Sequence, residues 1–209
     1  MHSLATFLTL HMIVGAQIPP DTLKDPPLEG WWAICRDPKS QTEDQLAPIK
    51  LAFRRKPWEV ADGKVWIPKV TGCRSPVVLL RDLPFLTARA VPKAKVVRTL
   101  KKDGGRSYAI RHGIERYTLD DSETGPPSNR QHRVRLIGPQ RSQNLKDDEY
   151  RMRPVELLWA GDLDGDGKLD LLLQVPSHEA ATIYRLFLSS AAKGDDLLDW
   201  IAEQLNAGC

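Results

Sequence analysis

The residues best suited to chemistry form one short segment, Asp-Leu-Asp-Gly-Asp-Gly-Lys-Leu-Asp at positions 162–170. Calcium binds six to eight oxygen ligands at about 2.3–2.6 Å, and carboxylates and main-chain carbonyls are its usual donors in proteins. A loop this short can direct its side chains at one point only where glycines permit sharp turns. The spacing therefore predicts a calcium (Ca²⁺) site. The expected ligands are four carboxylates and one main-chain carbonyl: Asp162, Asp164, Asp166 and Asp170, with the carbonyl from Lys168.

A plain polar turn and two other metal sites are the alternatives for this segment. Asp and Gly are ordinary turn formers, but four like charges in nine residues repel one another unless something neutralises them. Magnesium is disfavoured because it keeps its waters and takes few protein ligands. An EF-hand is excluded because its twelfth position, counted from Asp162, is Leu173 instead of a bidentate Glu. The flanks 155–160 and 169–175 are apolar runs of strand length, bounded by Pro154, Gly161 and Pro176. They predict a strand–loop–strand unit.

The segment 161–173 resembles the loop of FG-GAP repeats, of the integrin-α and VCBS type. In that family the loop aspartates and one main-chain carbonyl hold calcium between two strands. The resemblance covers residues 155–192, under a fifth of the chain. It implies the same ligands that the spacing predicts: Asp162, Asp164, Asp166, Lys168 and Asp170.

The chain also departs from that family. FG-GAP repeats normally form propeller blades in several tandem copies, whereas this sequence has one copy and no second Asp-x-Asp-Gly-Asp. Repeat folds need several units to bury a continuous core, so a full propeller is not expected. We expect instead a single calcium-binding β-hairpin built into another β-rich domain.

The amino-terminal end predicts export. Residues 1–16 contain no Lys, Arg, Asp or Glu, and small residues at 14 and 16 suit a cleavage site before Gln17. His2 stands where a signal peptide usually has Lys or Arg, so a buried N-terminal strand or helix stays open as the alternative. Residues 17–28 predict a proline-rich linker and residues 29–209 a single β-rich domain. A membrane-spanning helix needs about twenty apolar residues, and no apolar run is that long, so we expect no transmembrane segment. Together with the predicted signal peptide, this predicts a periplasmic or secreted protein.

The cysteine count predicts one disulfide and one remaining thiol in an oxidising compartment. Cys35 and Cys73 lie in or beside strand-like segments and are the preferred pair, while a disulfide from Cys209 stays open. If the N-terminus is not a signal and the protein is cytosolic, all three are free thiols. Zinc sites built on four cysteines or two histidines are excluded by counts and spacing.

Short apolar runs separated by turn residues predict a mainly β fold, an antiparallel sandwich or barrel. Polar stretches at 120–133 and 140–153 are expected to be surface loops, and a short C-terminal helix is expected from Asp195 or Asp196 to Gly208. The expected strands are 30–35, 49–53, 65–70, 76–80, 94–100, 107–110, 115–119, 134–137, 155–160, 169–175 and 183–189.

No arrangement of residues predicts an active site. The mature histidines, His112, His132 and His178, are isolated, and the chain has no Gly-x-Ser-x-Gly motif and no phosphate-binding loop. Residues 93–153 carry fifteen Lys and Arg against eight Asp and Glu, which suits an anionic polymer, although solvated strand faces would give the same pattern. Six tryptophans are interpreted first as core anchors and second as sugar-stacking groups.

These features predict an exported calcium-binding β protein, a binding or interaction module of the cell envelope in which calcium is structural. The alternative is an envelope hydrolase or polysaccharide-acting enzyme in which the same calcium loop only stabilises the fold. Beyond calcium, the expected partner is an anionic envelope polymer or another protein. Nucleic acid is not expected, because export separates the protein from it.

Overall fold

The computed structural model describes residues 12–14, 29–57, 64–102, 104–125, 131–145, 154–178 and 181–207. The expected linker at 17–28, most of the predicted signal peptide and Cys209 lie outside these residues. Within them the chain forms strands and no helix, and all strand pairings are antiparallel. The expectation of a mainly β, antiparallel fold is therefore confirmed. None of the described segments is a helix of the length and hydropathy needed to cross a membrane.

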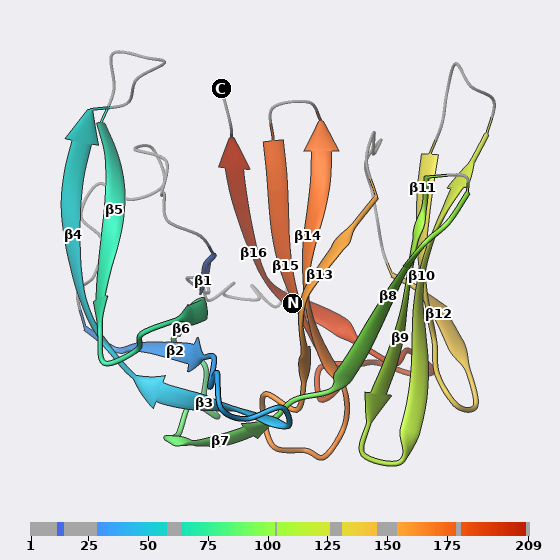
Figure 1. Cartoon of the computed structure of the whole chain (residues 1–209), viewed down its shortest axis with the longest axis horizontal. Helices are drawn as coiled ribbons and strands as arrows, with labels where there is room; N and C mark the ends of the chain where they lie inside the picture. Colours follow the sequence, from blue (N-terminus) through green and yellow to red (C-terminus); the bar gives the residue numbers. More distant parts are fainter. Residues whose placement is uncertain are drawn as a thin grey trace, which may run out of the picture.

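The first layer, called here the amino-terminal sheet, has the strand order β1-β6-β2-β3-β7. A separate hairpin, made by β4 and β5, follows β3 and stands away from this sheet (Figure 1). The bounds are β1 Met12–Ile13, β2 Trp31–Cys35, β3 Glu43–Pro48, β4 Lys50–Pro57, β5 Lys64–Thr71, β6 Pro76–Arg81 and β7 Arg89–Pro92.

Two further sheets complete the described part of the molecule. The lateral sheet has the order β12-β11-β10-β9-β8, and the central sheet has the order β13-β14-β15-β16. Figure 1 shows the central sheet between the lateral sheet and the amino-terminal sheet. The bounds are β8 Lys95–Leu100, β9 Arg106–His112, β10 Glu115–Thr124, β11 Gln131–Ile137, β12 Ser142–Asn144, β13 Glu156–Gly161, β14 Asp170–His178, β15 Ala181–Leu188 and β16 Asp199–Ala207.

The run Leu171-Leu172-Leu173 in β14 is apolar throughout because both faces of the central sheet are covered. Successive side chains of a strand point to opposite faces. Leu171 and Leu173 belong to the core shared with the lateral sheet, and Leu172 belongs to the core shared with the amino-terminal sheet. All three are at most 1% exposed. The central sheet is thus the layer that joins two hydrophobic cores.

The lateral sheet has one buried and one exposed face, so its strands alternate. Tyr108, Ile110, Leu119 and Leu136 are buried against the central sheet. The expectation of loops at 120–133 and 140–153 is wrong in part, since β10 continues to Thr124, β11 begins at Gln131 and β12 lies at 142–144. Polar residues can occupy these strands because one face is solvated.

The expected C-terminal helix is wrong, because this segment forms a turn followed by β16. The free edge of β15 pairs with β16 from Leu188↔Asp199 to Ala181↔Ala207. At the start, the Gln143 side chain accepts hydrogen bonds from the main-chain nitrogens of Leu197 and Leu198 at 2.8 and 2.9 Å, and it donates to the Leu198 carbonyl. Sheet pairing therefore overrides an apolar spacing that would also suit a helix.

The disulfide expected between Cys35 and Cys73 is confirmed, with Cα atoms 5.6 Å apart. It joins the end of β2 to the turn that follows β5. The neighbouring core contains Trp31, Ile49 and Leu51, and both cysteines pack against it.

Candidate metal centre

The aspartate-rich loop connects β13 to β14 in the central sheet, as the sequence predicted. Its two leucines fix it at both ends. Leu163 is fully buried in the core toward the amino-terminal sheet, and Leu169 is 2% exposed in the core toward the lateral sheet. The polar residues between them are therefore held at a surface position between the two cores.

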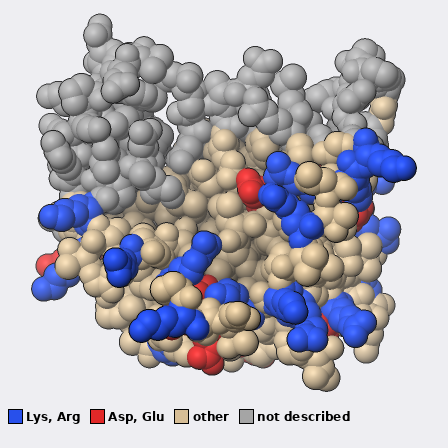
Figure 2. Space-filling view, viewed as in Figure 1, with Lys and Arg blue, Asp and Glu red and all other residues tan. Residues whose placement is uncertain are grey.

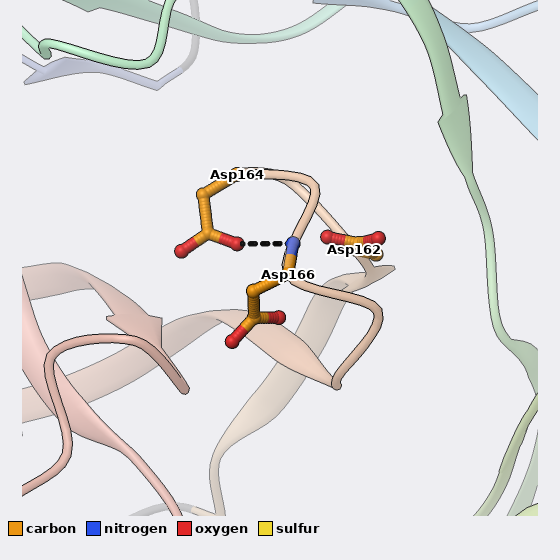
Figure 3. Close-up of side chains that lie close together, drawn as sticks. All are labelled: Asp162, Asp164 and Asp166. Carbon is orange, nitrogen blue, oxygen red and sulfur yellow. Dashed lines mark hydrogen bonds between the residues drawn. The ribbon is translucent and has the colours of Figure 1, made fainter.

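Three of the predicted ligands converge. Each of Asp162, Asp164 and Asp166 offers a carboxylate oxygen, and these oxygens lie within 4.8 Å of one another. Figure 3 shows the three side chains gathered at the turn of the loop. Asp162 is buried, Asp164 is half-buried and Asp166 is exposed, so the group is reached from solvent on one side. A cation with several oxygen ligands fits such a group.

Main-chain amides hold these carboxylates in place. Asp162 accepts hydrogen bonds from the nitrogens of Gly165 and Gly167 at 2.7 and 3.1 Å. Asp164 accepts one from the nitrogen of Asp166 at 3.2 Å (Figure 3). Both glycines have positive φ, +85° and +82°, a conformation that other residues rarely adopt. The two glycines are therefore required by the path of the loop.

Lys168 has an exposed side chain, and its main-chain nitrogen donates to the Asp166 carboxylate at 2.8 Å. The role predicted for it concerns its carbonyl, and that role stays a prediction.

Asp170 lies outside the group of three and is fully buried. Its carboxylate accepts hydrogen bonds from the nitrogen of Leu163 at 2.7 Å and from the nitrogen of Ser189 at 2.9 Å. Burial raises the pKa of Asp170 to about 7, and the charge of Asp164 acts in the same direction, while the hydrogen bonds from Ser189 and Leu163 oppose the rise. Asp170 thus ties the beginning of the loop to the end of β15.

Two serines after β15 belong to the site, and sequence reasoning missed both. The Ser189 hydroxyl lies 2.9 Å from an Asp166 oxygen and 3.1 Å from an Asp170 oxygen. The Ser190 hydroxyl donates to Asp164. Nothing in the sequence marks these serines, because only the pairing of β14 with β15 brings them to the loop.

The described part of the chain supplies no ion-pair partner to any of the four loop aspartates. The guanidinium of Arg89 on β7 lies beside Gly165 and donates to the carbonyl of Leu163. The negative charge of the loop is therefore left for a group from solution.

The entry to the loop is packed too tightly for any side chain at Gly161. A Cβ placed there would lie 2.3 Å from the Pro92 carbonyl oxygen and 2.6 Å from the Trp159 ring. The chain from β7 to β8 crosses at this point, where the nitrogen of Ala94 donates to Ala160 and the nitrogen of Asp162 donates to Pro92, both at 2.9 Å. Gly161 is thus the place where the three sheets meet.

A pocket of about 430 Å³ opens beside the loop. It lies between β10, the turn 139–141 and the segment 189–198. Within it the Tyr117 hydroxyl donates to Glu115, and burial together with Glu115 raises the pKa of Tyr117. Its other ionisable groups come from Arg141, Lys168 and Asp196.

The described residues hold no second metal-ligating group besides the three aspartates. His112 is buried at the end of β9, and the side chains of His132 and His178 lie outside the described part of the chain. Comparison with protein families finds no match for this chain, and comparisons with curated proteins and with solved structures find none either.

Proposed function

We propose that this protein is an exported, calcium-binding β protein that serves as a binding module of the cell envelope. Its loop at 162–170 would hold calcium as a structural ion. The observation that carries the proposal is the convergence of Asp162, Asp164 and Asp166 with no cation from the described chain paired to them.

Calcium suits this loop better than magnesium does. Calcium accepts irregular sets of protein oxygens, whereas magnesium requires a near-ideal octahedron and keeps most of its waters. The loop offers several carboxylate oxygens from one short turn, and the resemblance to FG-GAP loops adds Asp170 and the carbonyl of Lys168 to the ligands. Support for Asp170 comes from Ser189, whose hydroxyl contacts both Asp166 and Asp170.

A structural role follows from the position of the loop. Leu163 and Leu169 anchor it in two different cores, and Asp170 and Ser189 connect it to the end of β15. Neutralising the carboxylates would remove their mutual repulsion and so hold the two cores together at the loop. The disulfide between Cys35 and Cys73 supports export, since disulfides persist in oxidising compartments.

Thermal unfolding of the full chain, with 2 mM calcium or with a chelator, tests the proposal. Extracellular calcium modules have dissociation constants near 10⁻⁴ to 10⁻³ M. Calcium at 2 mM should therefore stabilise the protein by about 0.6 to 1.8 kcal/mol, a rise of a few degrees in Tm. The variant Asp164→Asn/Asp166→Asn should lose this rise.

The matched control is Asp195→Asn/Asp196→Asn, which removes the same charge from the turn before β16 and should keep the full calcium response. An equal calcium response in the loop variant, or no response in the native protein, would contradict the proposal. Magnesium at the same concentration should give a smaller rise, and a larger one would assign the loop to that ion.

A further inference from the structure

Basic side chains line up across the outer face of the lateral sheet. The strand register places Lys95 of β8 opposite Arg111 of β9, and Arg111 opposite Arg116 of β10. All three side chains are exposed. Neighbouring strands lie about 4.8 Å apart, so three positive charges form a continuous row. Figure 2 shows Lys and Arg side chains over the part of the molecule where Figure 1 places the lateral sheet.

The same face carries two more arginines on β11. Arg133 and Arg135 are exposed and lie two residues apart, so they point to one side of the strand. This is the side of the basic row. Arg116 and Thr118 share a face of β10, Thr118 pairs with Ile137, and Ile137 shares a face of β11 with the two arginines. The acid on this face, Asp120, lies opposite Arg135 and forms an ion pair with Lys101 at 2.6 Å.

The other cations of the lateral sheet have acidic partners, which sets this face apart. Arg98 and Arg106 both lie near Glu156, at 3.7 and 3.8 Å. Apart from the Lys101–Asp120 pair, no carboxylate of the described residues forms an ion pair with a cation of the basic row or of β11, and Arg135 donates to the Ser142 hydroxyl. Like charges directly opposite one another destabilise a sheet. The row therefore lowers stability unless an anion binds it.

The neutral residues of the face indicate the class of anion. A strip runs between the basic row and the β11 arginines and contains Val97, Ala109, Thr118 and Ile137, of which Val97 is 55% and Ile137 41% exposed. The described residues of this face include no aromatic ring. Sheets that bind single-stranded nucleic acid depend on aromatic rings for base stacking. An acidic sugar chain would bind through its carboxylates, and the C–H face of its sugar rings would lie on the apolar strip.

We propose that the outer face of the lateral sheet binds an acidic polysaccharide, with uronate carboxylates paired to Arg111, Arg116 and Lys95. Guanidinium groups bind carboxylates in a bidentate manner, and a row of cations across three strands suits a linear chain. The proposal rests on the proposed function, since it names the ligand of the binding module, but it does not depend on the calcium loop.

The test is the binding of an oligogalacturonate of about ten sugars, measured by calorimetry in chelator at 50 mM NaCl. The variant Arg111→Gln/Arg116→Gln should bind at least tenfold more weakly, and the slope of log Kd against log salt should fall by about two. The control Lys69→Gln/Arg74→Gln removes two exposed cations elsewhere and should change Kd less than threefold. A second variant, Arg133→Gln, removes an exposed cation of the same face on β11 and should also weaken oligogalacturonate binding.

Equal loss in both double variants would overturn the proposal, because binding would then reflect net charge alone. Tighter binding of a single-stranded DNA oligonucleotide of equal charge would assign the face to nucleic acid instead, and absence of oligogalacturonate binding by the native protein would also refute the proposal. The variant Asp164→Asn/Asp166→Asn should bind the sugar normally. Failure of the calcium site and failure of the sugar face are therefore separate results.

Discussion

The disulfide between Cys35 and Cys73 and the loop 162–170 each connect strand ends, but they depend on different properties of the surrounding medium. At the end of β2, the middle strand of the amino-terminal sheet, the disulfide between Cys35 and Cys73 is complete within the chain. In the central sheet, the loop 162–170 gathers carboxylates whose charge no described cation neutralises. The first link depends on the redox state of the medium. The second, on our proposal, depends on its calcium concentration.

Removing the disulfide should have the largest effect. The bond closes a loop with a sequence separation of 38 residues, which corresponds to about 4 kcal/mol in the loop-entropy treatment. Cys35→Ser/Cys73→Ser should lower the free energy of unfolding in urea by about that amount. The stabilisation by calcium should persist, because the loop lies in a different sheet. Cys209→Ser should change the stability little, and a large loss in that variant would point to a different pairing.

A side chain at Gly161 should disturb the loop whether or not calcium is present. The Pro92 carbonyl cannot move away without losing its hydrogen bond from Asp162, so Gly161→Ala should cost about 1–3 kcal/mol through overpacking. Chemical denaturation, with calcium and with chelator, measures this. Gly138→Ala is the control, since its φ, like that of Gly161, is not positive and its Cβ would come no closer than 3.3 Å to a neighbouring atom. A smaller loss at Gly161 than at Gly138 would contradict the packing argument.

Asp170 should make calcium-free stability depend on pH. Its pKa is raised to about 7 in the folded protein, whereas an unfolded Asp titrates near 3.9. The folded state therefore favours the protonated carboxyl, and stability should fall as pH rises from about 4 to about 7, by up to about 1.4 kcal/mol per pH unit. Urea midpoints in chelator across this range measure the effect. Asp170→Asn should flatten the dependence, and an unchanged slope would rule out Asp170 as its source.

The sequence was most informative where a pattern is local. The loop aspartates lie within nine residues, and the alternation of β9 and β11 follows from one buried and one exposed face. The pairing of Cys35 with Cys73 could be preferred because each lies in or next to a strand-like run.

Long-range pairing explains what the sequence did not reveal. Ser189 reaches Asp170 only through the pairing of β14 and β15. The segment from Asp195 or Asp196 to Gly208 predicts a helix because Leu197, Ile201 and Leu205 fit a helical spacing. It forms a turn and β16 instead, since it pairs with the edge of β15 and its start is held by Gln143. The basic row needed the register of three strands, since Lys95, Arg111 and Arg116 show no regular spacing along the chain.

Residues 12–14 are buried and include the short strand β1, which is the alternative to a signal peptide that the sequence left open. Met12 and Ile13 pair with Leu80 and Leu79 on β6, and the nitrogen of Val14 donates to Gln204 of β16 at 2.6 Å. Cleavage after residue 16 would remove all three residues. The precursor would then carry its own edge strand, whereas the mature protein would present the hydrogen-bonding edge of β6 to any extended chain that could add a strand there.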